Sequence, residues 1–196
     1  MITKTIIENV LIISAEGFWL VSNYSQLQKL IKTRKLKGLY APNQVLNAAG
    51  NIAWATYFFS RHLYVPFITN LTMMLITLTT LFYLLGNKKQ FTKGIIAIAV
   101  IGPLTSYLLV AYPSMSGWVG VVYNAIASTP WFVHVLRTKR VSGISERSIY
   151  FSLSAMLTTL SYGILISSIP LITGCVIGLT FNLIIMRYYY HYRLHD

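Results

Sequence analysis

The chain has 196 residues, of which 55% are hydrophobic and 10% are charged, and its mean hydropathy is +0.60. Soluble domains carry roughly 25% charged residues, so this composition excludes an ordinary soluble protein and indicates an integral membrane protein in a lipid bilayer. Sixteen Lys and Arg against four acidic residues would indicate a nucleic-acid partner in a soluble protein. In a membrane protein basic loops instead set the orientation, and we expect no nucleic-acid partner.

Seven apolar runs follow one another along the chain, separated by polar residues. They are 6–27, 42–60, 65–86, 92–111, 116–136, 147–165 and 169–190. A helix of about 20 residues crosses the hydrocarbon core and pairs its own backbone groups, so these runs predict seven transmembrane helices in an all-α fold. The first run lacks a small-residue cleavage site after it, and we interpret it as a span rather than a removed signal peptide.

The basic residues gather on one side of these spans. With the N-terminus outside, fourteen of the sixteen fall on the cytosolic side, and only Lys4 and Arg61 remain for the other side. The fourteen are Lys29, Lys32, Arg34, Lys35, Lys37, Lys88, Lys89, Lys93, Arg137, Lys139, Arg140, Arg147, Arg187 and Arg193. Because cytoplasmic loops carry an excess of Lys and Arg, this bias predicts an outside N-terminus and a cytosolic C-terminus, with the cell membrane as the expected location.

Two basic stretches resemble each other: "KLIKTRKLKGLY" at 29–40 and "HVLRTKRVSGIS" at 134–145. They are 105 residues apart, and an ungapped comparison aligns Gly38 with Gly143. The duplication predicts two units of three spans, and a linker helix is required if both units are to lie in the membrane in the same sense. The parts are 1–90 for the first unit, 91–114 for the linker helix and 115–196 for the second unit. Parallel repeats of this kind are typical of transporters, whose substrate site lies between the repeats.

This three-one-three arrangement, with a basic "KTR…KG" or "RTK…SG" loop after the first helix of each unit, resembles the SWEET sugar transporters and the wider PQ-loop group. The resemblance covers nearly the whole chain. The Pro-Gln pair of the group is incomplete in both copies, since one copy reads Ser25-Gln26 and the other Pro130-Trp131. In the family this proline is thought to act as a hinge, so the resemblance implies a hinge at Pro130 and places the corresponding position of the first copy at Ser25 and Gln26.

A polar stripe follows the second predicted span. Asn47, Asn51 and Trp54 lie at i, i+4 and i+7, on one face of a helix. The resemblance implies that Trp54 is a sugar-stacking aromatic and that Asn70 is the hydrogen-bonding asparagine of the third helix. An indole can cover the apolar face of a pyranose, and a neutral amide both donates to and accepts from hydroxyls. The alternative is that the asparagines bond to neighbouring helices and that Trp54 is ordinary packing.

The second unit offers smaller side chains at the corresponding positions. The shift of 105 places Thr159 opposite Trp54, and it places Gly174 or Cys175 opposite Asn70. We therefore expect a lopsided cavity, with stacking and amide contacts from the first unit and small side chains, Thr159 and Cys175 among them, from the second.

The first helix of each unit carries its own polar stripe. Glu16, Trp19 and Asn23 in the first unit correspond to a stripe that includes Asn124 and Ser128 in the second. A carboxylate near the middle of a span is costly and usually faces a cavity or a partner. Glu16 is therefore a candidate for proton coupling or for binding a ligand hydroxyl or amine, unless it lies near the outer interface.

These features favour a transporter of a small polar solute, with a sugar facilitator as the first hypothesis. The alternatives are an exporter of amino acids or another cationic metabolite, proton-coupled through Glu16, and a membrane receptor or sorting protein on the same fold. A homo-oligomer is compatible with any of these. The sequence has no HExxH motif, metal-ligand cluster or Ser/His/Asp set, so we expect neither an enzyme nor a metal or other cofactor.

Overall fold

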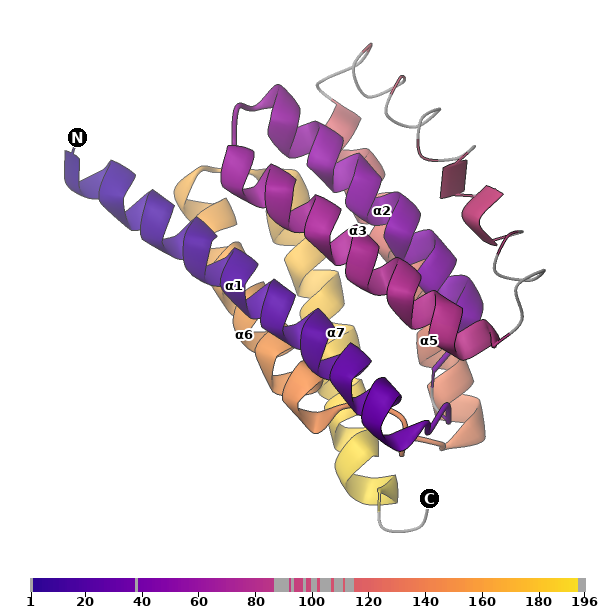
Figure 1. Ribbon diagram of the computed structural model, residues 1–196. Helices are drawn as coiled ribbons and strands as arrows, with labels where there is room; N and C mark the ends of the chain where they lie inside the picture. Colours follow the sequence, from indigo (N-terminus) through magenta and orange to yellow (C-terminus); the bar gives the residue numbers. More distant parts are fainter. Residues whose placement is uncertain are drawn as a thin grey trace.

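The computed structural model describes residues 2–37, 39–86 and 115–193, with residues 92, 94–96, 98–99, 102, 107 and 111 between them. Within this part of the chain there are helices and no strands. The helices are α1 (Ile2–Thr33), α2 (Ala41–Ser60), α3 (Tyr64–Leu85), α5 (Ser116–Thr138), α6 (Glu146–Leu165) and α7 (Ile169–Tyr192) (Figure 1). Gly38, Lys88, Lys89, Lys93 and most of the predicted linker 91–114, with its span 92–111, lie outside the described residues.

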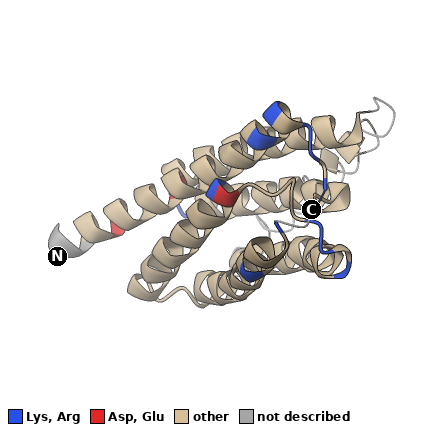
Figure 2. Cartoon of the chain, turned by 90° about the horizontal axis from the view of Figure 1, so that it is seen from below, with Lys and Arg blue, Asp and Glu red and all other residues tan. Residues whose placement is uncertain are grey.

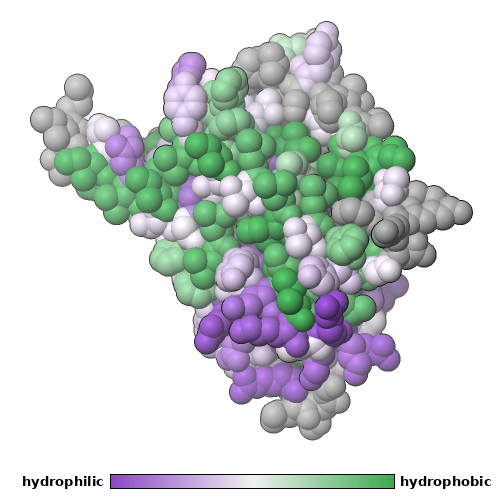
Figure 3. Space-filling view, viewed as in Figure 1, coloured by the Kyte–Doolittle hydropathy of each residue, from purple (hydrophilic) through white to green (hydrophobic). Residues whose placement is uncertain are grey.

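Five of the described helices are long and apolar enough to cross a membrane: α1 from Thr5, α3, α5 from Gly117, α6 and α7. Their outward faces are apolar, as on α3, where Ile68 is 60% and Leu75 is 59% exposed. Figure 3 shows hydrophobic side chains over most of the length of the helices. Such surfaces are stable in lipid and not in water, so the chain is an all-α, multi-pass integral membrane protein.

α2 has 20 residues, as many as α6, but is not among the five. It carries four amide side chains that lower its hydropathy, namely Asn43, Gln44, Asn47 and Asn51. All four face the interior of the protein, as described below.

The predicted spans on either side of the linker agree with α2, α3, α5, α6 and α7 to within two residues at each end. The first prediction, 6–27, was too short, because α1 continues to Thr33. Hydropathy ends a span where charges begin, whereas Gln, Leu and Lys are good helix formers and extend the helix beyond the apolar part. Lys29 and Lys32, which we expected in a loop, therefore belong to α1, and the backbone leaves the helix at Arg34 with φ of 53°.

The helices form a ring in which each has two main neighbours. α3 packs between α1 and α2, α7 packs between α5 and α6, and the ring is closed by α1 against α6 and α2 against α5 (Figure 1). Exchanging α1, α2 and α3 for α5, α6 and α7 leaves this set of neighbours unchanged.

Most of the described Lys and Arg residues gather at one end of the ring, away from the N-terminus (Figure 2). Figure 3 shows the same end as a hydrophilic zone beside the C-terminus. We call it the basic end. It is made by Lys29, Lys32, Arg34, Lys35, Lys37, Arg137, Lys139, Arg140, Arg147, Arg187 and Arg193.

Each end of the ring has its own apolar cluster. The cluster at the basic end comprises Val135, Val141, Ile144, Ile149, Ile185 and Tyr189, all from α5 to α7 and their connection. The cluster at the opposite end comprises Ile12, Trp54, Tyr57, Phe58, Val121, Tyr162 and Leu171, from five of the described helices. The cavity in the interior is lined by polar as well as apolar side chains.

Candidate functional site

A cavity of about 310 Å³ lies inside the ring, and all six described helices line it. Nine of the described residues that line it carry neutral amides: Asn23, Gln26, Asn43, Gln44, Asn47, Asn51, Asn70, Asn124 and Asn182. The lining also includes the aromatic side chains Trp19, Trp54, Phe58, Trp131 and Phe181. Among the described residues that line the cavity, Glu16 is the one charged side chain, and there is no Lys, Arg or His.

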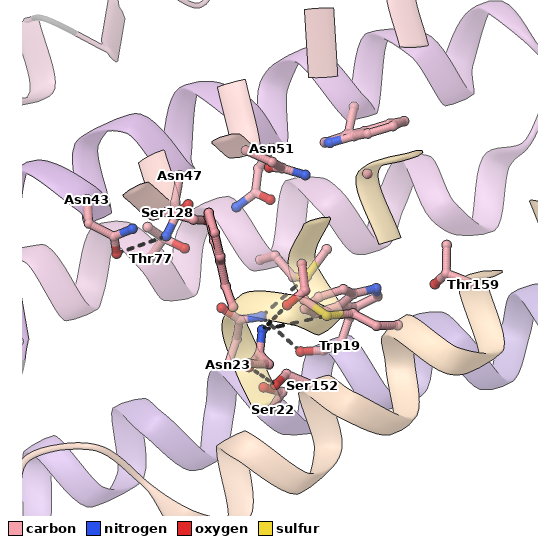
Figure 4. Close-up of a pocket in the computed structure, with 18 of the residues that line it drawn as sticks. Trp19, Ser22, Asn23, Asn43, Asn47, Asn51, Thr77, Ser128, Ser152 and Thr159 are labelled. Carbon is pink, nitrogen blue, oxygen red and sulfur yellow. Dashed lines mark hydrogen bonds between the residues drawn. The ribbon is translucent and has the colours of Figure 1, made fainter. Parts of the chain in front are cut away.

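The structure brings together around this cavity every residue that the sequence nominated for substrate binding. These are Trp19, Asn23, Asn47, Asn51, Trp54, Asn70, Asn124, Ser128, Thr159 and Cys175. In Figure 4, Asn43, Asn47 and Asn51 follow one another along one helix, with Trp19 and Asn23 across the cavity from them. Their role in binding a solute stays a prediction.

The predicted hinge positions are separated by the fold. Gln26 lines the cavity, whereas Ser25 and Pro130 do not. Ser25 is buried within the uninterrupted α1, and Pro130 lies inside α5. A hinge at either position stays a prediction.

Glu16 lies on the face of α1 that is turned to the interior of the ring, and its depth in the membrane stays a prediction. Its side chain lines the cavity and the residue is only 5% exposed. Oε2 is buried and has no hydrogen-bond partner among the described residues. A carboxyl group in such a place is stable if it takes up a proton or gains a partner.

Some cavity amides are hydrogen-bonded within the protein, either to a neighbouring helix or within their own. Asn43 on α2 donates from Nδ2 to the Ala127 carbonyl oxygen on α5 at 2.9 Å, and its Oδ1 accepts from Asn47 Nδ2 at 3.1 Å (Figure 4). Asn70 donates to the Pro66 carbonyl oxygen of its own helix at 2.8 Å. Asn47 therefore bonds to a residue of its own helix, and the bond to a neighbouring helix is made by Asn43.

Two further amides are available to a solute. The side chains of Asn51 on α2 and Asn124 on α5 line the cavity but form no hydrogen bond with any residue that the structure describes. Asn124 lies close to α2, the helix that carries Asn51, since a Cβ added at Gly50 of α2 would be 3.6 Å from Asn124 Oδ1. An unpartnered amide facing a cavity can both donate and accept, which is the chemistry that a hydroxyl group requires.

One cavity amide of the predicted second unit was not among the site residues predicted from the sequence. Asn182 on α7 lines the cavity, accepts from Ser152 Oγ at 2.8 Å and donates to the Gly178 carbonyl oxygen at 3.1 Å. Cys175, Gly178 and Asn182 lie at i, i+3 and i+7, so the same periodicity that identified the stripe on α2 would have found it. With Asn124, it gives the second unit two amides, and the cavity is less lopsided than expected.

Trp54 is packed more tightly than a free stacking surface would be. It is 8% exposed, and its ring lies 5.7 Å from that of Phe58 at an interplanar angle of 26°. Gly120 on α5 lies against the indole, because an added Cβ there would be 2.6 Å from Cε2 and 2.9 Å from Cδ2. Glycine at position 120 therefore lets α5 approach the tryptophan that lines the cavity.

Gly120→Ala is expected to displace Trp54 and to lower the stability of the protein by about 1–3 kcal/mol, the usual cost of overpacking a close interface. Gly50→Ala is the matched control on the same pair of helices, since its Cβ would meet Tyr123 Cβ at an ordinary 3.5 Å. Thermal unfolding in detergent measures both variants. Equal apparent Tm values for the two would contradict the close contact at Gly120.

The two similar stretches of the sequence meet at the basic end, next to the cavity. Gln26 Nε2 donates to the Gly143 carbonyl oxygen at 2.9 Å, and Gln26 Oε1 accepts from Ser145 N at 2.8 Å. Gly143 N donates to the Lys37 carbonyl oxygen at 2.8 Å, and Lys29 Nζ donates to the Ile144 carbonyl oxygen. These bonds, which we call the loop contact, join α1 and its following loop to the α5–α6 connection.

Comparison with known proteins does not assign the chain to a family: no family model and no curated protein matches it. The chemistry of the site therefore has to be argued from the cavity itself. Amides, hydroxyls and aromatic rings around a cavity suit a small polar molecule with several hydroxyl groups.

Proposed function

We propose that the protein is a membrane transporter of a small polar solute, with a sugar as the favoured substrate class. The observation that carries this proposal is the cavity of about 310 Å³ inside the ring of helices, lined by neutral amides and aromatic rings. Small-molecule sites have volumes of about 300–1,000 Å³, so this one suits a small solute. A polar cavity among membrane-spanning helices is also where solute pathways are found.

The ring supports an alternating-access mechanism of the SWEET type. Its set of neighbours is unchanged when α1 to α3 are exchanged for α5 to α7, as expected if 1–90 and 115–196 are two parallel three-helix units joined by the linker 91–114. The two units would rock against each other around the cavity. The loop contact lies between them, so it would have to break for the cavity to open at the basic end.

The distribution of charge supports the orientation. The positive-inside rule places the basic end in the cytosol, and with it the C-terminus, which leaves the N-terminus outside. The protein would then reside in the cell membrane and carry its solute between the outside and the cytosol.

Asn51→Ala and Asn124→Ala are expected to weaken transport without weakening the fold. Neither amide bonds to a described residue, so truncation breaks no hydrogen bond within the described part of the chain, while a solute loses one. Such a loss of about 1.4 kcal/mol corresponds to about a tenfold lower apparent affinity. Uptake of labelled sugars and amino acids into proteoliposomes measures the effect.

Asn43→Ala is the contrasting variant, because it removes the bond to Ala127 and the acceptor of Asn47. We expect a lower apparent Tm for this variant alone. If no sugar in the panel moves through well-folded wild-type protein in either direction, the proposed function is wrong.

A further inference from the structure

Glu16 is the one acidic side chain in the described lining of the cavity, and transport of a neutral sugar does not explain it. It is 5% exposed, it lines the cavity, and its buried Oε2 has no hydrogen-bond partner among the described residues. Burying a carboxylate without a partner is unfavourable, so such a group either takes up a proton or binds a counter-ion.

The described protein does not supply the missing partner. α1 packs against α3 and α6, whose cavity-lining residues are Asn70, Met73, Thr77, Ser148, Ile149, Ser152, Met156 and Thr159. None of them is charged, and no Lys, Arg or His belongs to the described lining. A counter-ion for Glu16 would therefore have to enter the cavity from solution.

The surroundings of Glu16 favour an ammonium group as that counter-ion. Trp19 lies one turn along α1 and also lines the cavity. Indole rings attract cations through their π faces, and a carboxylate forms strong hydrogen bonds with an ammonium group. The unpartnered amides of Asn51 and Asn124 remain available for hydroxyl groups of the same molecule.

We propose that the cavity binds a hydroxylated solute that carries one ammonium group, such as an amino sugar, with Glu16 as its counter-ion. This inference rests on the proposed transport function and names the class of substrate. Glu16 contacts the ammonium group, the asparagines contact the hydroxyl groups, and the neutral sugar of the same shape binds more weakly because it leaves Glu16 without a partner.

Glucosamine and glucose are the matched probes, because they differ only in the amine that replaces one hydroxyl. Wild-type protein, Glu16→Gln and Glu8→Gln are each reconstituted into proteoliposomes. Uptake is then measured at a pH that keeps the amine protonated. Glu8 is the control because it is the other acidic residue of α1 and does not line the cavity. Wild type and Glu8→Gln should take up glucosamine at least about tenfold more efficiently than glucose, and Glu16→Gln should lose this preference through a loss of glucosamine uptake.

A second measurement uses only the wild-type protein and therefore does not depend on whether a variant folds. Glucosamine should raise the apparent Tm of the wild-type protein in detergent more than glucose does at the same concentration, because only the native state binds it. Equal shifts would contradict the inference.

Each other outcome also decides between the proposals. If wild type moves both sugars equally, or if Glu16→Gln slows both equally, the ammonium inference is wrong while the transport function stands. Uptake of glucose driven by an imposed pH gradient and abolished in Glu16→Gln would assign Glu16 to proton coupling and would also overturn the inference. If neither sugar moves, the inference and the sugar-transport proposal both fail.

Discussion

Gly143→Ala is expected to lower the free energy of unfolding by about 1–3 kcal/mol or more, the cost of forcing an extra methyl group into a filled site. A Cβ at this position would lie 2.7 Å from the Lys35 carbonyl oxygen and would also overlap the Lys37 carbonyl oxygen. Both atoms belong to the backbone, so they cannot rotate away as the end of a side chain can. The substitution would push apart the two basic stretches and break the bond from Gly143 N to Lys37.

Gly17→Ala is the matched control for this prediction. An added Cβ at Gly17 has no heavy atom within 4 Å, and the residue lies inside α1, where alanine is favoured over glycine by about 1 kcal/mol. We expect unchanged or higher stability for Gly17→Ala and a clear loss for Gly143→Ala, measured by thermal unfolding in detergent. A Gly143→Ala protein as stable as wild type would show that the two stretches are not in contact.

This contact between Gly143 and the first stretch explains why the sequence comparison was informative but incomplete. The similarity of 29–40 and 134–145 indicated a duplication, and the charge of both stretches indicated one side of the membrane. It did not indicate that the two stretches bond to each other, because similarity between segments says nothing about their distance in space.

Just before the two stretches, Gln26 and Trp131 stand at corresponding positions, and the structure gives them different partners. In the first copy Gln26 reaches across to the α5–α6 connection. At the corresponding position of the second copy, Trp131 packs against the apolar cluster of the basic end. An amide and an indole therefore occupy equivalent places in α1 and α5 with different partners, and only the structure shows which partners they have.

The helices and most of the cavity were predictable because both follow local periodicity. Apolar runs located α2, α3, α5, α6 and α7, and the stripes that include Asn51 and Asn124 located two faces of the cavity. The end of α1 was missed because a helix can continue beyond the apolar part of its sequence. The tight packing of Trp54 was not predictable either, since it depends on Gly120 of a helix far along the chain.

Gln26→Ala is expected to open the cavity at the basic end more often. The substitution removes both bonds from the Gln26 amide to the α5–α6 connection and leaves Ser145 N and the Gly143 carbonyl oxygen without these partners. An unsatisfied group in a partly buried place costs about 1–3 kcal/mol. Because both groups are exposed to water once the contact opens, this cost falls on the closed state and shifts the balance toward the open one.

Cys175 is a built-in reporter of that opening. It is the single cysteine of the chain, it lines the cavity, and it is free and only 7% exposed. A shift of about 1.4 kcal/mol toward the open state would raise its rate of modification by a membrane-impermeant thiol reagent about tenfold. Cys175→Ser gives the background of the assay.

Gln28→Ala separates this effect from a general loosening of α1. Gln28 is two residues away, has the same side chain and forms no hydrogen bond with any described residue. If the loop contact holds the basic end closed, Gln28→Ala should react at the wild-type rate while Gln26→Ala reacts faster and has a lower apparent Tm. Equal rates in all three proteins would mean that the loop contact does not control access to Cys175. Access would then be controlled by the apolar cluster at the opposite end of the ring, which contains Trp54.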